Sequence, residues 1–198
     1  MSIDSQARLD ELEARIITSD PTPKLRAHAK QLVMGEGDLD ANIVFIGEAP
    51  GKKEDLEGRP FVGASGRILN TMLADADIDR GDVYITNIVK YRPPNNRDPL
   101  PEERAAFLPL LIEQLNIIDP KVVITLGRIS MEYFIPDERI SDVHGQPRQV
   151  MFGDHEITVV PLFHPAAGLR NGKIRQIMTE DFKNTLEYVK SLSVTQRQ

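Results

Sequence analysis

Three polar side chains stand where apolar, strand-like segments of the sequence end. Glu48 follows the run NIVFIG, Asn87 lies within VYITNIV, and His164 follows EITVVPLF. A carboxylate can position water, a carboxamide presents a donor beside an acceptor, and an imidazole can donate or accept a proton. Our first hypothesis is that these three groups share one site.

Each group also has a structural interpretation. Asn87 could cap a strand end, where its amide would find hydrogen-bond partners. An unpaired buried amide costs about 1–3 kcal/mol. A lone histidine such as His164 is more often a packed or surface residue than a catalytic one. The segment GEAPGKKEDLEGRPFVGASGR, residues 47–67, could be a plain loop. That last interpretation leaves the apolar Phe61 in a polar loop unexplained.

Several other chemistries are disfavoured. The stretch from Gly58 to Ser65 approaches a phosphate-binding loop, but Ala64 stands where the lysine is needed. The chain has no cysteine, which excludes disulfides, thiolate nucleophiles and cysteine-ligated clusters. The remaining histidines form no H-E-x-x-H motif, and no G-x-S-x-G elbow is present. No metal site is expected.

The elements that would position these groups alternate between strands and helices. Strands are predicted at 42–46, 83–89, 121–127 and 156–165, and helices at 5–17, after Ser65 as N-cap, at 101–118, for about two turns after 127, and at about 174–191. Residues 48–63 and the run HPAAGLRNGK are expected to be loops, the latter flexible and basic. Alternating strands and helices indicate a mainly parallel α/β sheet, which binds ligands beyond the carboxyl ends of its strands.

The bulk properties fit one globular domain. The chain has 198 residues, 40% of them hydrophobic and 27% charged. It shows no apolar run of membrane-spanning length and no secretory signal, so no membrane association and a cytoplasmic location are expected. The net charge is −6, yet Lys90, Arg92 and Arg97 lie in a stretch without carboxylates. This stretch could form a basic face for nucleic acid or an ordinary solvated surface.

The sequence resembles family 4 uracil-DNA glycosylases. The segments that carry the resemblance are GEAPGKKEDLEGRPFVGASGRILNTML, VYITNIVKYRPPNNRDPLPEE and LFHPAAGLR, in the family's order and spacing. The resemblance implies a three-layer α/β/α sandwich around a central four-stranded, mainly parallel sheet. It implies one domain over 1–198, with an N-terminal helix at about 4–18 and a core at about 33–191.

The resemblance also implies roles for individual residues. Glu48 would position the attacking water, and His164 would donate a hydrogen bond to uracil O2. Phe61 would stack on the flipped uracil and Asn87 would read its Watson–Crick edge, with backbone contacts from Gly47 and Ala49. The residues expected to contact DNA are Ser65, Arg67, Arg92, Leu169 and Arg170.

The chain departs from the family at two places. Family members usually carry four cysteines that hold a [4Fe–4S] cluster, and the corresponding positions here are Tyr91, Ala106 and, in uncertain register, Pro21 and Lys24. No cluster or other cofactor is therefore expected, and Tyr91 is expected to fill the space. The residue that often wedges into the base stack is Gly168 here, and Leu169 is the substitute we expect.

The function implied is hydrolysis of the N-glycosidic bond of deoxyuridine in DNA by a monomeric enzyme of base excision repair. Its expected partner is DNA that contains uracil. Two alternatives remain open at this point. The chain could be a non-catalytic DNA-binding module of the same fold, or a glycosylase with another base preference.

Overall fold

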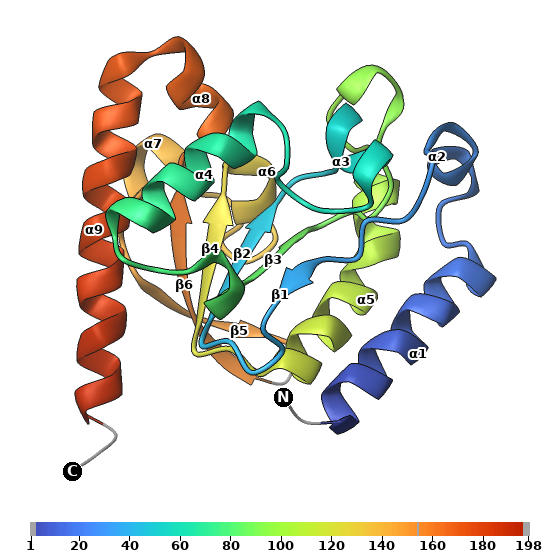
Figure 1. Cartoon of the computed structure of the whole chain (residues 1–198), viewed down its shortest axis with the longest axis horizontal. Coiled ribbons are helices and arrows are strands. Elements are labelled where there is room, and N and C mark those ends of the chain that lie inside the picture. Colours follow the sequence, from blue (N-terminus) through green and yellow to red (C-terminus); the bar gives the residue numbers. More distant parts are fainter. Residues whose placement is uncertain (1–2, 154, 196–198) are drawn as a thin grey trace.

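A computed structural model describes residues 3–153 and 155–195, apart from a few side chains within them. One mixed sheet of six strands has the order β1-β3-β2-β4-β6-β5 (Figure 1). The strands are β1 Glu36–Gly37, β2 Ile43–Gly47, β3 Tyr84–Asn87, β4 Val122–Leu126, β5 Arg148–Phe152 and β6 His155–Leu162. The four central strands are parallel, as the sequence predicts, and the edge strands β1 and β5 add antiparallel pairs that it does not.

Helices cover both faces of the sheet. They are α1 Ile3–Ser19, α2 Pro23–His28, α3 Lys52–Glu57, α4 Ala64–Asp75, α5 Pro101–Ile118, α6 Arg128–Met131, α7 Ile140–Val143, α8 Pro165–Arg170 and α9 Gly172–Thr195. Two short 3₁₀ turns, η1 Arg80–Asp82 and η2 Pro94–Asn96, lie in the connections. Figure 1 shows α4 and α9 on one side of the sheet and α1 and α5 on the other. This is the predicted three-layer arrangement.

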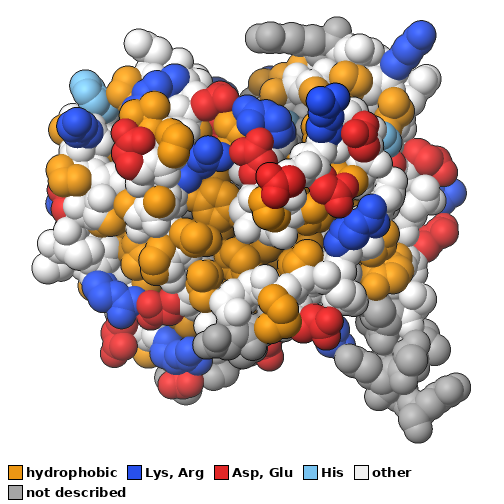
Figure 2. Space-filling view, turned by 180° about the vertical axis from the view of Figure 1, so that it is seen from behind, with side chains coloured by type: hydrophobic (Ala, Val, Ile, Leu, Met, Phe, Trp, Pro, Cys, Tyr) orange, Lys and Arg blue, Asp and Glu red, His pale blue; other side chains and the backbone are white. Residues whose placement is uncertain are grey.

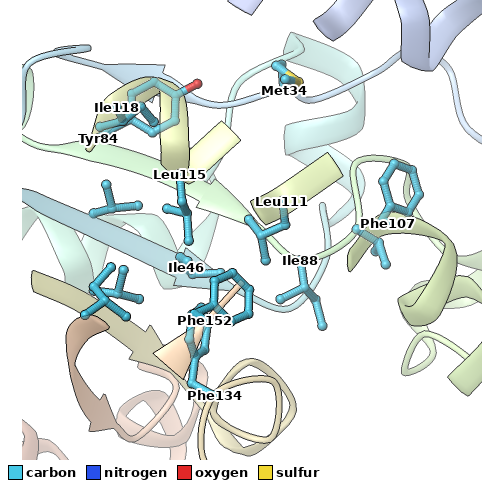
Figure 3. Close-up of a cluster of buried hydrophobic side chains, with 14 of the residues drawn as sticks. Met34, Ile46, Tyr84, Ile88, Phe107, Leu111, Leu115, Ile118, Phe134 and Phe152 are labelled. Atoms are coloured by element: carbon cyan, nitrogen blue, oxygen red, sulfur yellow. The ribbon is translucent and has the colours of Figure 1, made fainter. Parts of the chain in front are cut away.

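Alternation along the buried strands builds one hydrophobic cluster on each face. Phe45 packs with Leu69 of α4 and stacks on Phe182 of α9, with ring centroids 5.9 Å apart. Its neighbour Ile46 points to the opposite face and packs with residues of α5 such as Leu111 (Figure 3). Because successive side chains of a strand face opposite ways, continuous apolar strands supply both clusters.

The ends of α5 illustrate how local sequence fixes an element. Pro101 occupies its first turn, where a missing N–H is harmless. The Glu103 carboxylate accepts a hydrogen bond from the Leu100 backbone N–H at 2.7 Å. At the other end Asp119 adopts a left-handed conformation with φ 51°, just before Pro120.

Four local predictions are wrong. The N-cap of α4 is Gly63 rather than Ser65, which lies inside the helix. The segment 48–63 contains the helix α3, and only one turn, α6, follows Gly127. The run after His164 is helical, because Pro165 starts α8 and the imidazole accepts the Ala166 N–H.

The surface carries charges of both signs. On the face opposite to that of Figure 1, acidic and basic side chains are interspersed around a hollow lined by hydrophobic side chains (Figure 2). None of the helices in the described part of the chain is long and apolar enough to span a membrane.

Candidate active site at the carboxyl ends of the parallel strands

One cavity of about 410 Å³ lies beyond the carboxyl ends of β2 and β3. These strand ends are at the upper end of the sheet in Figure 1. Glu48 follows β2, Asn87 ends β3, and His164 follows β6, so three separate strands deliver the polar groups. Phe61 comes from the loop between α3 and α4. The full lining is Glu48, Ala49, Pro50, Gly51, Glu54, Phe61, Ser65, Asn87, Pro93, Asn96, Arg97, His164 and Ala166.

Glu48 is half-buried at the cavity wall. Burial raises the pKa of its carboxyl to about 7, and the negative charge of Asp98 acts in the same direction. The guanidinium groups of Arg128 and Arg104 partly oppose this rise. At neutral pH a large fraction of Glu48 is therefore still protonated, and the group is poised to exchange a proton near pH 7.

Asn87 is buried, and its register partner in β2 is Gly47. Within the described residues the Asn87 carboxamide makes no hydrogen bond, so its donor and acceptor are free for a ligand in the cavity. A Cβ on Gly47 would collide with Asn87 Oδ1 and would lie 2.5 Å from Phe61 Cζ. Glycine at position 47 is what allows the amide and the ring to approach each other.

Phe61 has a strained backbone. Its φ of 50° lies in the left-handed region, which costs a non-glycine residue on the order of 1 kcal/mol. Its carbonyl packs so closely on Gly66 that any side chain at position 66 would collide with it. The ring lies beside His164, with centroids 6.0 Å apart and planes tilted by 35°.

Two side chains that sequence reasoning missed clamp the loop that carries Phe61. The Glu54 carboxylate accepts hydrogen bonds from the backbone N–H groups of Val62 at 3.0 Å and Gly63 at 2.8 Å. Arg80 donates from Nη2 to the Pro60 carbonyl at 2.7 Å. These contacts hold the strained residue from both sides. Glu54 could have been suspected as a carboxylate within the first motif, whereas Arg80 carries no sequence signal.

His164 is held in one tautomer. Its Nδ1 accepts a hydrogen bond from the Ala166 backbone N–H at 3.1 Å, so the proton of the neutral ring resides on Nε2. Burial lowers the pKa of the imidazole to about 4, although the charge of Glu54 acts in the opposite direction. At neutral pH the cavity wall therefore offers an uncharged N–H donor.

Comparison with known proteins assigns the chain to a family. The sequence profile of the Uracil DNA glycosylase superfamily matches residues 34–190. The chain belongs to this superfamily. It is 43% identical over 170 residues to a type-4 uracil-DNA glycosylase of Thermotoga maritima, covering 84% of this chain and 87% of that protein.

Two further relatives, one of type 4 and one of type 5, differ in how much of the chain they match. A type-4 uracil-DNA glycosylase of Sulfurisphaera tokodaii is 43% identical over 185 residues, with 90% of this chain and 84% of that protein covered. A type-5 uracil-DNA glycosylase of Thermus thermophilus is 36% identical over 115 residues, with only 50% of this chain and 52% of that protein covered. The type-4 likeness is therefore the more extensive of these.

The residues expected to contact DNA lie in different surroundings from one another. Ser65 lines the cavity, Arg67 is exposed on α4, and Leu169 is 51% exposed on α8. Arg92 is turned back, with Nε donating to Asn96 Oδ1 at 2.7 Å. The side chain of Arg170 lies outside the described residues.

The basic face expected around residues 90–97 is only partly formed. Lys90 is fully buried, so its assignment to a surface was wrong. Arg97 lines the cavity, but its guanidinium forms a bidentate pair with Glu103 at 2.6 and 2.8 Å. The stretch lacks carboxylates in sequence, yet a glutamate from the following helix meets it in space.

Packing occupies the region where the resemblance to family 4 placed the cluster positions. Tyr91 is 3% exposed, and its ring meets Phe107 edge-on with centroids 6.2 Å apart. This matches the expectation that Tyr91 fills space. Over residues 3–153 and 155–195, no group of three or more His, Cys, Asp or Glu side chains could hold a metal ion.

Proposed function

We propose that the protein is a uracil-DNA glycosylase that hydrolyses the N-glycosidic bond of a flipped deoxyuridine, releasing uracil and leaving an abasic site. The observation that carries the proposal is the convergence of a free carboxamide, a neutral imidazole donor and a carboxylate in one cavity. The type-4 names of its relatives support it.

Recognition follows from the shape and polarity of the cavity. A target base must leave the stack, at a cost of a few kcal/mol. Stacking on Phe61 offsets about 1–3 kcal/mol of that cost. The Asn87 carboxamide can donate to uracil O4 and accept from N3–H, whereas cytosine presents the reverse pattern. Backbone N–H groups around Gly47 and Ala49 add contacts to the base.

The bond breaks with its electron pair moving onto uracil, which leaves positive charge on the sugar. The Nε2–H of neutral His164 donates to O2 and stabilises the uracil anion, and loss of one such fixed donor typically costs 10²–10³-fold in rate. Ionised Glu48 orients a water molecule toward C1′ and accepts its proton as the new C–O bond forms. The uracil anion then takes up a proton from solvent.

The surface around the cavity would hold the DNA. We propose backbone and groove contacts from Ser65, Arg67, Arg92 and Arg170, with the exposed Leu169 as the wedge. Arg92 would have to leave Asn96 to reach a phosphate. One chain supplies all residues lining the cavity, so a monomer suffices. No cofactor takes part in these steps, and a cytoplasmic enzyme working at the nucleoid fits this substrate.

One assay tests the proposal. A 5′-labelled oligonucleotide containing uracil is incubated with the protein and then treated with alkali, which cleaves abasic sites. We expect cleavage at uracil and none in matched thymine or cytosine strands. A gel shift without cleavage would indicate a non-catalytic binding module, and cleavage at hypoxanthine but not uracil would indicate another base preference. Preincubation with a chelator should leave uracil release unchanged, since the chain has no cysteine.

A further inference from the structure

Lys90 is the one fully buried lysine in the described part of the chain, and the chemistry proposed above does not use it. Its ammonium group donates three hydrogen bonds. The acceptors are Thr86 Oγ1 at 2.6 Å, the backbone carbonyl of Asn87 at 2.8 Å and Gln114 Oε1 at 2.5 Å. All three donor hydrogens are therefore used.

The polar network around Lys90 reaches into the core between β3 and α5. Gln114 Nε2 donates to the Met34 carbonyl and to Tyr84 Oη, both at 3.1 Å. Thr86 Oγ1 also donates to the Met34 carbonyl, at 2.7 Å. Every acceptor of the ammonium is thus itself fixed by another contact or by the backbone.

No carboxylate of the described residues forms an ion pair with Lys90. A buried cation that meets only neutral acceptors is expensive, and burial lowers its pKa to about 7. Its neighbours are neutral acceptors, so packing alone does not account for a charged group at this position. The energetic penalty indicates that Lys90 serves something other than folding.

The contact with Asn87 indicates what Lys90 serves. The Asn87 carboxamide has no hydrogen bond of its own within the described residues, so its direction depends on the backbone beneath it. On one side this backbone is held by β2, where Ile88 N–H donates to the Gly47 carbonyl at 3.0 Å and Val89 N–H to the Glu48 carbonyl at 3.2 Å. On the other side the Asn87 carbonyl meets the Lys90 ammonium.

We propose that Lys90 is a positioning residue for base recognition, which fixes the Asn87 peptide from behind and thereby aims the Asn87 carboxamide at the base. The proposal rests on the proposed function, because it concerns the same cavity. Lys90 does not touch the substrate. It acts through Asn87, so its effect must disappear when the Asn87 side chain is removed.

A double-mutant cycle tests this dependence. Lys90→Met, which keeps most of the length and removes the ammonium, is combined with Asn87→Ala, and kcat/KM for uracil release is measured for both single variants and the pair. We expect Lys90→Met to lower kcat/KM at least tenfold. In the Asn87→Ala background the same substitution should change kcat/KM by less than about twofold, because the group it positions is absent.

A matched control separates positioning from damage to the network. Tyr84→Phe removes a hydroxyl from the far end of the same network without touching Asn87. The Tyr84→Phe variant should be less stable than the wild type, and its kcat/KM should stay within about threefold of the wild-type value. Inhibition by free uracil gives a second readout, and Lys90→Met should weaken it by a factor similar to the loss in kcat/KM. A merely structural role would leave uracil inhibition per folded molecule unchanged.

The outcomes are distinct. Wild-type release of uracil with a non-additive cycle supports the positioning role. Wild-type release with additive losses, or with Lys90→Met as active as wild type, overturns it and leaves the proposed function standing. Absence of uracil release from the wild type overturns the proposed function itself. If Lys90→Met does not fold, the same cycle with Lys90→Gln, which is polar but one bond shorter, gives the same decision.

Discussion

Glu48→Gln should make the protein more stable at alkaline pH while it removes activity. The pKa of Glu48 is raised from 4.5 to about 7 in the folded chain. Between these pH values the folded state binds a proton that the unfolded state has lost. The contribution of Glu48 to stability is therefore most favourable below pH 4.5 and falls as pH rises from 4.5 through 7. Without solvent screening, this rise in pKa corresponds to about 3 kcal/mol of unfolding free energy. Screening at a half-buried site reduces the effect to about 1–2 kcal/mol.

Urea unfolding at pH 5 and pH 8.5 measures this effect. At pH 8.5 we expect Glu48→Gln to be more stable than the wild type by about 1–2 kcal/mol, because the uncharged amide avoids the burial penalty. At pH 5 the difference should be clearly smaller, since the native carboxyl is then protonated and the unfolded carboxyl is only partly ionised. Glu187→Gln, at an exposed position of α9, is the control and should show no such pH dependence.

Activity should move in the opposite direction. For the wild type, kcat/KM should fall as pH drops below about 7, because the protonated carboxyl cannot accept a proton from water. Glu48→Gln should lose turnover at every pH while its affinity for uracil-containing DNA changes less than about tenfold, or 1.4 kcal/mol. A variant with wild-type turnover, or one less stable than wild type at pH 8.5, would refute this reasoning.

Three further predictions concern neighbouring positions. Asn87→Asp should reduce uracil release and favour cytosine relative to uracil, measured on matched oligonucleotides, because a carboxylate cannot donate to O4; an unchanged uracil rate would make Asn87 a scaffold residue. Gly47→Ala should lower kcat/KM by at least 10²-fold with a folded circular dichroism spectrum, because its Cβ displaces the Asn87 amide and the Phe61 ring. Tyr91→Ala should lower the free energy of unfolding by about 3–5 kcal/mol, because the buried ring is lost, with little loss in rate per folded molecule. An unchanged melting temperature would show that the ring does not stabilise the fold.

Sequence predicted the central part of the fold because its signals are local. A strand buried on both faces is continuously apolar, so β2 and β4 stand out from the polar segments around them. The helix at 101–118 was predicted with its observed bounds, since Pro101 and Asp119-Pro120 mark its ends. The two-residue strand β1 and the edge strand β5 escaped prediction, because pairing with a neighbour creates them rather than their own pattern.

The site residues also fall into those that the sequence predicts and those that it does not. Glu48, Asn87 and His164 could be grouped from sequence because the carboxyl ends of parallel strands meet at one edge of the sheet. Arg80 and Lys90 could not be assigned, because their roles depend on partners far away in the chain. Lys90 donates to Gln114 24 residues away, and Arg80 donates to the Pro60 carbonyl 20 residues away. The positive charge of Lys90 led to the prediction of a surface position, whereas its side chain is fully buried.

Three features of the cavity wall bear on the energetics of the site. Phe61 holds a left-handed backbone, the Asn87 amide lacks a partner within the described residues, and Glu48 carries a raised pKa. The backbone of Phe61 and the buried carboxyl of Glu48 each cost roughly 1–2 kcal/mol, in a domain whose total stability is on the order of 5–15 kcal/mol. A flipped uracil would bond to the amide and stack on the ring, so the strained backbone of Phe61 holds a group that contacts the base. The protein itself holds this strained geometry through Glu54 and Arg80, so the site is formed before the base enters, and a preformed site gains selectivity for one base over another.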